Sequence, residues 1–281
     1  MTKHRLRAYW WRGGPRHGNF GDLLTPVLLE HLSGRPVEHC SPQEADIIGV
    51  GSVLEPGFWA AGSWAGFAGF IWGAGRMTGE RPMEMPAARV AAVRGKWTLR
   101  ALGCRNKEAV CLGDPGLLAC LLAEKKKARY KLGIIPHWSE FLNPAVSAMA
   151  ALSPEILLVD PCGSVRGVLD NICRCQHILS SSLHGLILAD SLGVPNAWLR
   201  LNLGHEKRMG LPEFKYRDYY SVFGLENAEF VTPADATGLD AILEKMSCYE
   251  RPGVEEVKAR LLASFPFGAG NSGAKAKEAR A

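Results

Sequence analysis

The chain lacks the sequence motifs of several common enzyme classes. It has no GxSxG segment, no HExxH segment and no protein-kinase signature. The turn Gly49-Val50-Gly51-Ser52 is rich in glycine, but no Gly-Lys-Ser/Thr sequence follows it, which excludes a P-loop. The same turn is not a complete dinucleotide-binding fingerprint either. If the chain is an enzyme, its site is of a kind that these motifs do not describe.

Cysteine is present, but not in the arrangement of a metal site or a disulfide framework. No CxxC pair occurs among the eight cysteines, and Cys173-x-Cys175 is not a spacing typical of a metal site. Cys111 and Cys120 lie in apolar runs, which favours buried free thiols. We therefore expect a reducing, cytoplasmic compartment, no metal and no bound cofactor.

The chain also has no signal-peptide pattern and no basic stripe with interleaved aromatic residues. Residues 1–7 are basic but lack an apolar core and a cleavage site. The net charge of +5 is mild. It fits a small anionic substrate or a loose association with anionic lipid, and we expect no nucleic-acid partner. The run Lys125-Lys126-Lys127 is interpreted as part of a solvated linker.

Residues 58–75 contain no charged residue, and their length is that of a candidate membrane segment. Five glycines make this stretch only weakly hydrophobic, and it contains two GxxxG spacings. We expect a buried loop followed by a strand at residues 70–73. The alternatives are a membrane span or a peripheral contact with a membrane surface, which would be that of the inner membrane.

Short apolar runs alternate with helical patterns along the whole chain. Strands are predicted at residues 6–11, 47–50, 70–73, 88–93, 109–112, 132–135, 156–159, 176–179 and 196–199. Helices are predicted at residues 23–32, 96–102, 183–192, 239–246 and 254–262. The first helix has Thr25-Pro26 as a candidate cap and first position, although a start near Asp22 is also compatible with the pattern.

This alternation predicts an α/β fold with two doubly wound, Rossmann-like domains and a cleft between them. The charged run at residues 124–131 is interpreted as the linker, so that the domains cover residues 1–127 and 128–267. The tail at residues 268–281 is expected to be disordered. In such folds, ligands bind at the carboxyl ends of the strands.

The segment Ser180-Ser181-Ser182-Leu183-His184-Gly185 is the most informative part of the sequence. It joins a predicted strand to a predicted helix, with Ser182 as the candidate N-cap and Gly193 just past the helix end. His184 then lies in the first helical turn, where free N–H groups and the helix dipole favour an anion. This arrangement indicates chemistry on a phosphate or carboxylate; the alternative is a hydrogen-bonded capping histidine.

Three other loops after predicted strands carry polar side chains. In Gly18-Asn19-Phe20-Gly21-Asp22, the aspartate is a candidate base, or alternatively an N-cap. In Arg94-Gly95-Lys96, the arginine suits a carboxylate or phosphate, or is a surface cation at a helix start. In Pro136-His137-Trp138, the two aromatic rings could contact a sugar, or form a structural turn.

These motifs, in this order, resemble those of the polysaccharide pyruvyl transferases, and in particular bacterial exopolysaccharide ketal-pyruvate transferases. The resemblance covers about residues 6–225. It rests on Gly18-Asn19-Phe20-Gly21-Asp22, Val93-Arg94-Gly95, Gly113-Asp114-Pro115 and Ser182-Leu183-His184-Gly185. Within the third motif, Asp114 is interpreted as a structural turn residue rather than a catalyst.

The resemblance implies a GT-B-like fold and transfer of an enolpyruvyl-derived group from phosphoenolpyruvate to a sugar. The family's donor-binding arginine falls on Arg94, its essential histidine on His184 and its motif aspartate on Asp22. The predicted roles are as follows: catalytic His184, Arg94 and Asp22; donor-binding Arg94, Lys96, Ser182, Leu183 and Gly185; acceptor-binding Asn19, His137 and Trp138. The acceptor is expected to be a sugar or a lipid-linked oligosaccharide.

One departure from the family pattern concerns charge. Many members carry arginine two positions before the histidine, where this chain has Ser182. The donor site therefore has one positive charge fewer, and Lys96, Lys207 and Lys215 are the candidates to replace it.

Two other functions stay open from the sequence. A nucleotide-sugar glycosyltransferase would place a diphosphate in the same position and needs a carboxylate near the ribose, for which only Glu206 stands out. A non-catalytic module that binds a glycan or a membrane would account for residues 58–75 and the eight tryptophans.

Overall fold

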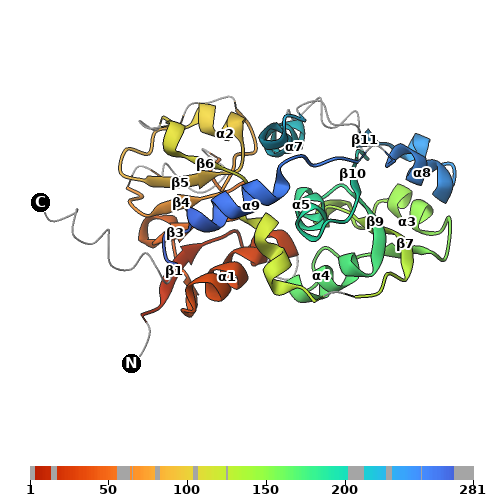
Figure 1. Ribbon diagram of the computed structural model, residues 1–281, viewed down its shortest axis with the longest axis horizontal. Helices are drawn as coiled ribbons and strands as arrows, with labels where there is room; N and C mark the ends of the chain where they lie inside the picture. Colours follow the sequence, from red (N-terminus) through yellow and green to blue (C-terminus); the bar gives the residue numbers. More distant parts are fainter. Residues whose placement is uncertain are drawn as a thin grey trace, which may run out of the picture.

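The computed structural model describes residues 4–13, 18–55, 64, 66–79, 83–103, 107–124, 126–201, 212–225, 230–247 and 249–268. These residues form two parallel β-sheets with helices around them (Figure 1). Across the first sheet the order is β2 (Val37–His39), β1 (Leu6–Tyr9), β3 (Ile47–Ile48), β4 (Phe70–Trp72), β5 (Arg89–Val93) and β6 (Cys111–Leu112). Across the second sheet the order is β11 (Phe230–Val231), β10 (Asn196–Leu199), β9 (Cys175–Ser180), β7 (Tyr130–Ile135) and β8 (Ile156–Leu158). The predicted α/β class with two parallel, Rossmann-like sheets is confirmed.

The described helices connect these strands. They are α1 (Phe20–Ser33), α2 (Lys96–Ala101), α3 (Pro144–Ala150), α4 (Val165–Cys173), α5 (Leu183–Leu192), α7 (Pro212–Tyr220), α8 (Leu239–Lys245) and α9 (Val254–Ala263). A 3₁₀-helix, η4 (Pro115–Leu122), follows the first sheet. All nine predicted strands and all five predicted helices have a counterpart in the structure.

Both sheets reverse their strand order at an equivalent place. In the first sheet, β1 pairs with β2 on one side and β3 on the other. In the second sheet, β7 pairs in the same way with β8 and β9. In each sheet, the chain therefore first adds a strand on one side of the central strand, β1 or β7, and then adds the following strands on its other side. A doubly wound sheet opens a crevice at the carboxyl ends of its strands at this reversal point.

The sheets are buried on both faces, as parallel sheets require. Alternate residues of one strand enter different apolar clusters: Trp72 belongs to the largest cluster, whereas Ile71 belongs to a second one. In the second sheet, Ile178 and Leu179 are divided in the same manner between the largest cluster and a third one. We call the first sheet with its surrounding elements the first half of the protein, and the second sheet with its surrounding elements the second half. The largest cluster contains residues of both sheets, so the two halves share a continuous core.

The first helix begins earlier than Thr25-Pro26 indicated, and that prediction is wrong. The helix starts at Phe20, because the Asn19 side chain accepts hydrogen bonds from Gly21 N at 2.9 Å and Asp22 N at 3.3 Å. Asn19, and not Asp22, is therefore the N-cap. At α5 the predicted boundaries hold: Ser182 is the N-cap, without a side-chain capping bond, and Gly193 is the left-handed C-cap with φ 67°.

Two C-terminal segments return to the first sheet. Helix α9 packs on η4 and β6, and Trp72 Nε1 donates a hydrogen bond to Leu261 O at 3.1 Å (Figure 1). Helix α7 packs on α2, where a Cβ atom on Gly95 would collide with the backbone of Asp218. Both segments therefore connect the C-terminal part of the chain to elements that belong to the first sheet or follow its strands.

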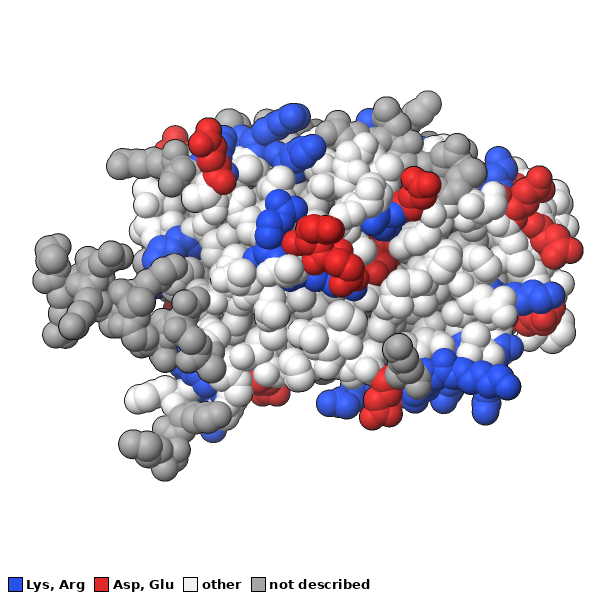
Figure 2. Space-filling model, viewed as in Figure 1, with Lys and Arg blue, Asp and Glu red and all other residues white. Residues whose placement is uncertain are grey.

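Several sequence predictions concern residues outside the described ranges. Residues 56–63 and 65, Lys125, the segment His205-Glu206-Lys207 and the tail 269–281 belong to this group. Within residues 58–75, the predicted strand is confirmed as β4. Among the described helices, none has the length and apolar character needed to cross a lipid bilayer. Basic and acidic side chains are interspersed over the face shown in Figure 2.

Candidate functional site

A pocket of about 200 Å³ lies between the two halves, at the carboxyl ends of the strands where both sheets reverse. The first half contributes side chains that follow β1, β3 and β4: Trp11, Asn19, Asp22, Ser52, Val53 and Met77. The second half contributes side chains that follow β7 and β9, and one from α7: His137, Trp138, Ser182, Leu183, His184 and Lys215. The position agrees with the expectation for doubly wound sheets.

Most of the predicted site residues meet in this pocket. Those that line it are Asn19, Asp22, His137, Trp138, Ser182, Leu183 and His184. Arg94, Lys96 and Gly185 are not among its lining residues. Gly185 has a packing role, since a Cβ atom there would collide with Ser180 Oγ at the end of β9. The backbone N–H of Lys96 donates to Ser221 Oγ at 3.0 Å.

Arg94 is fully buried directly behind the pocket wall. Its Nε forms an ion pair with Asp218 Oδ2 at 2.9 Å, and its Nη1 donates to Ser52 Oγ at 2.6 Å. Its Nη2 donates to Arg76 O. Because Ser52 lines the pocket, Arg94 is one side chain away from a ligand there. The buried pair with Asp218 offsets much of its positive charge, and direct donor binding by Arg94 stays a prediction.

His184 occupies the first turn of α5 and packs against the start of α1. A Cβ atom on Gly21 would collide with the imidazole, so glycine is needed there for the two helices to approach. The ring atom Nε2 lies 3.9 Å from Asp114 Oδ2. Within the described part of the chain, neither of these two buried atoms has a hydrogen-bond partner.

The electrostatic environment of His184 favours the neutral imidazole in the empty pocket. Burial lowers its pKa to about 3, and the positive charges of Arg94 and Lys215 act in the same direction. Asp114 is also buried, which raises its pKa to about 6, although Gly116 N–H donates to its other oxygen at 2.8 Å. The expected turn role of Asp114 is confirmed by this bond, which caps η4. Its second oxygen nevertheless faces His184.

Asp22 is a buried carboxyl group with a pKa near neutrality. Burial raises its pKa to about 7, against the opposing effects of the Asn19 hydrogen bond and of Lys215. Asn19 Nδ2 donates to Asp22 Oδ2 at 2.6 Å. A carboxyl group with a pKa close to the working pH is suited to general acid–base catalysis.

An aromatic pair from both halves forms one side of the pocket. The rings of Trp11 and Trp138 have centroids 5.9 Å apart and planes inclined by 30°. Next to them, the His137 backbone N–H donates to Ser181 Oγ at 2.9 Å. Burial, with Lys215 and His184, lowers the pKa of His137 to about 3. Sequence reasoning missed Trp11 because it counted this residue within the first strand, which ends at Tyr9.

Lys215 brings a positive charge into the pocket from α7. Burial is the largest influence on the pKa of Asp22, His137 and His184, and the charge of Lys215 lowers all three. Of the candidates to replace the family arginine at Ser182, Lys215 lines the pocket and Lys96 does not. Lys207 lies outside the described residues.

Comparisons with known proteins agree with the motifs. Residues 87–202 match the family model described as polysaccharide pyruvyl transferase. This range includes Arg94, Asp114, His137 and His184, whereas Asp22 and Lys215 lie outside it.

Two relatives match parts of the chain. The succinoglycan biosynthesis protein ExoV of Rhizobium meliloti is 28% identical over 229 residues, which are 78% of this chain and 66% of that protein. An uncharacterized protein of Acanthamoeba polyphaga mimivirus is 33% identical over 144 residues, which are 49% of each chain. The chain thus spans about half of the length of one relative and about two thirds of that of the other. The family match and the relative in succinoglycan biosynthesis together confirm that the chain resembles the polysaccharide pyruvyl transferases.

Proposed function

We propose that the chain transfers a pyruvyl group from phosphoenolpyruvate to two hydroxyl groups of a sugar, forming a cyclic ketal on a polysaccharide or its lipid-linked precursor. The observation that carries the proposal is the pocket that joins His184, Asp22 and Lys215 at the carboxyl ends of both sheets. A GT-B-like arrangement of two doubly wound halves, with the site between them, is part of the same proposal.

The donor end of the pocket is the first turn of α5 together with Lys215. Phosphoenolpyruvate carries a phosphate and a carboxylate close together, so its site needs positive charge in a small volume. The ammonium group of Lys215 and the N–H groups at the start of α5 supply it. Arg94 contributes indirectly, because its hydrogen bond orients the hydroxyl group of Ser52, which lines the pocket. The pocket volume of about 200 Å³ is enough for a donor as small as phosphoenolpyruvate.

The acceptor end lies at the aromatic pair. Indole rings present flat apolar surface to the C–H faces of a sugar, and Trp11 and Trp138 line the pocket from opposite halves. Asn19 and His137 contribute polar atoms beside them. An acceptor bound here would direct its hydroxyl groups toward Asp22.

The proposed reaction begins with proton transfer from His184 to the methylene carbon of phosphoenolpyruvate, which makes C2 electrophilic. One acceptor hydroxyl adds to C2 and releases its proton to Asp22. The C2–O bond to phosphate then breaks, and the second hydroxyl adds to C2. The two hydroxyl groups release two protons in total. One of them returns His184 to its protonated form, and the other leaves with phosphate.

Release of inorganic phosphate tests this proposal. The protein is incubated with phosphoenolpyruvate and a panel of sugar and lipid-linked acceptors, and phosphate and ketal product are measured. We expect acceptor-dependent release that His184→Ala reduces ~10²–10⁴-fold without unfolding the chain. Near-normal transfer by His184→Ala would overturn the role of this residue. Thermal stabilisation by UDP but not by phosphoenolpyruvate would favour a glycosyltransferase instead.

A further inference from the structure

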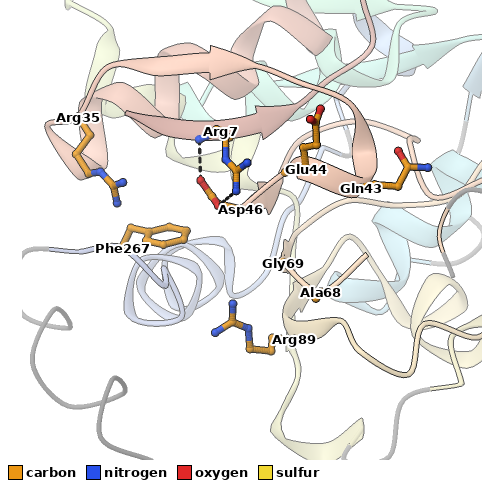
Figure 3. Close-up of a pocket in the computed structure, with 10 residues that line it drawn as sticks. Arg7, Arg35, Gln43, Glu44, Asp46, Ala68, Gly69, Arg89 and Phe267 are labelled. Carbon is orange, nitrogen blue, oxygen red and sulfur yellow. Dashed lines mark hydrogen bonds and ion pairs between the residues drawn. The ribbon is translucent and has the colours of Figure 1, made fainter. Parts of the chain in front are cut away.

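A second cavity, of about 380 Å³, lies at the opposite edge of the first sheet. Its lining residues come from the amino ends of the strands: Arg7 lies at the start of β1, Asp46 just before β3, Gly69 just before β4, and Arg89 at the start of β5 (Figure 3). Phe267, beyond α9, forms part of its wall. The cavity shares no lining residue with the pocket that contains His184.

The cavity carries more positive charge than its own acidic residues offset. Asp46 is engaged by Arg7, whose backbone N–H and Nη2 donate to it at 2.9 and 3.0 Å. Glu44 accepts from Ser41 Oγ at 2.7 Å, and its carboxylate points away from Arg89 in Figure 3. In the described part of the chain, Arg35 and Arg89 have no acidic partner. The lining therefore has three arginines against two carboxylates, an excess of one positive charge, and Arg35 and Arg89 are the two arginines without an ion pair among the described residues.

Aromatic rings hold these two guanidinium groups in place. Arg89 Cζ lies 4.0 Å from the centroid of the Phe70 ring, and Arg35 Cζ lies 5.6 Å from that of Phe267. The two phenylalanines contact each other edge to face, with centroids 5.5 Å apart. A guanidinium group that stacks on a ring keeps its N–H edge available to an anion. Ring contacts thus position both cations without using a carboxylate.

Arg35 is further fixed by the backbone. Its Nε donates to His4 O at 2.8 Å and its Nη2 to Arg5 O at 3.1 Å. Figure 3 shows the guanidinium groups of Arg35 and Arg89 on either side of Phe267, both turned toward the cavity. Because two backbone hydrogen bonds already hold Arg35, binding an anion beside it loses less conformational entropy than binding at mobile surface lysines.

We propose that this cavity is a second anion site, which binds the phosphate groups of a phosphorylated molecule through Arg35 and Arg89. The Arg89 guanidinium can donate paired hydrogen bonds to phosphate oxygens, and the Nη1 group of Arg35, whose Nε and Nη2 are bonded to the backbone, can add a further donor. The cavity volume exceeds that of one phosphate. The occupant is therefore a diphosphate or a phosphate that carries an organic group. A soluble phosphorylated metabolite and a phospholipid headgroup share this chemistry, and the experiment separates the two sources.

Titration calorimetry with inorganic pyrophosphate at low ionic strength tests the site. In the Lys215→Ala background, which weakens the donor pocket, we expect pyrophosphate binding that Arg89→Ala or Arg35→Ala weakens at least tenfold. Arg166→Ala, an exposed arginine of α4, is the matched control and is expected to leave binding unchanged. Arg89→Lys keeps the charge but not the fork, and an intermediate affinity is expected even if the alanine variant folds poorly.

Vesicle sedimentation identifies the source. Vesicles of phosphatidylcholine with phosphatidic acid are compared with vesicles of phosphatidylcholine alone. Sedimentation that needs phosphatidic acid and is lost on Arg35→Ala with Arg89→Ala assigns the site to a lipid headgroup. No sedimentation, together with Arg89-dependent pyrophosphate binding, assigns it to a soluble ligand. Arginine variants that bind pyrophosphate and vesicles like the unmodified protein would overturn the proposal, whatever the outcome at His184.

Discussion

Asp114 Oδ2 lies 3.9 Å from His184 Nε2, and the two residues come from opposite halves of the protein. Asp114 caps η4 after the first sheet, and His184 opens α5 after β9. Both atoms are buried without a hydrogen-bond partner among the described residues. Such orphaned buried atoms are rare in folded proteins. If His184 takes up a proton when an anionic donor binds, the carboxylate of Asp114 is placed to stabilise the charged imidazole.

Asp114→Asn is expected to lower turnover about 10- to 100-fold with a smaller effect on folding. The asparagine oxygen can still accept from Gly116 N–H, so the cap of η4 is kept. Without the carboxylate, the pKa of His184 in the donor complex falls, since a nearby negative charge raises the pKa of a histidine. The pH profile of kcat should therefore shift to lower pH. Loss of activity with an unchanged pH profile would indicate a structural role only.

Phosphoenolpyruvate is expected to bind more weakly as the pH rises from 6 to 8. In the empty pocket, burial and the charges of Arg94 and Lys215 lower the pKa of His184 to about 3. A bound dianion raises this pKa, so binding takes up a proton and is favoured at low pH. Calorimetry in two buffers of different ionisation enthalpy measures the uptake. His184→Ala should reduce the uptake to the part that Asp22 contributes, and an affinity independent of pH would contradict the coupling.

Lys215→Ala is expected to raise the KM for phosphoenolpyruvate at least tenfold, which corresponds to about 1.4 kcal/mol. Lys215 lines the pocket, and in the proposed function it takes the place of the family arginine that is missing at Ser182. Lys215→Arg should restore most of the affinity, since it keeps the charge. Lys131→Ala serves as the control, because Lys131 is partly exposed, lies outside the pocket and is paired with Glu155. An unchanged KM would assign the donor charge to another residue.

The sequence predicted the architecture better than it predicted the contacts between the two halves. Apolar runs such as residues 176–179 identify buried strands, because parallel sheets need them and turns interrupt them. Helix α4 also had a readable signal that was missed: Ser164 caps it, and Val165, Val168, Leu169 and Ile172 are its buried residues. Helix α7 has no such apolar periodicity, and it carries Lys215.

The site residues also differ in how far the sequence predicts their positions. His184, Asp22 and His137 follow strands, so the topology alone brings them together. The burial of Arg94 depends on Asp218, which is 124 residues away in the chain, and no local pattern encodes that ion pair. Likewise, Asp114 has the sequence of an ordinary turn, and only the approach of α5 gives its second oxygen a partner to face.

Asp22→Asn is expected to stabilise the protein at alkaline pH while lowering activity. Burial raises the pKa of Asp22 to about 7, so the folded state holds its proton more tightly than the unfolded state does. The wild type therefore loses stability as the pH rises from about 4 through 7, where this carboxyl ionises. Each pKa unit is about 1.4 kcal/mol, so the gain for asparagine is a few kcal/mol at pH 8 and disappears near pH 4.

Thermal unfolding at several pH values measures this effect. The same trend is expected, in smaller degree, for Asp114, whose pKa burial raises to about 6. His137 and His184 act in the opposite direction at acid pH, because burial lowers their pKa to about 3 and stability rises as the pH increases from there to about 6.5. The difference between Asp22→Asn and wild type isolates Asp22. Asp240→Asn, at an exposed position of α8, serves as the control substitution.

Trp11→Ala is expected to raise the KM for the sugar acceptor about tenfold and to leave the KM for phosphoenolpyruvate nearly unchanged. Trp11 and Trp138 face each other at 5.9 Å across the two halves, so removing one indole takes away half of the apolar surface on which a sugar ring would lie. Trp11→Phe should retain part of the affinity because it keeps a ring. Leu142→Ala, at an exposed apolar residue outside the pocket, is the control. An equal rise in both KM values would instead mean that Trp11 maintains the closure of the two halves, and the acceptor would then bind elsewhere along the pocket.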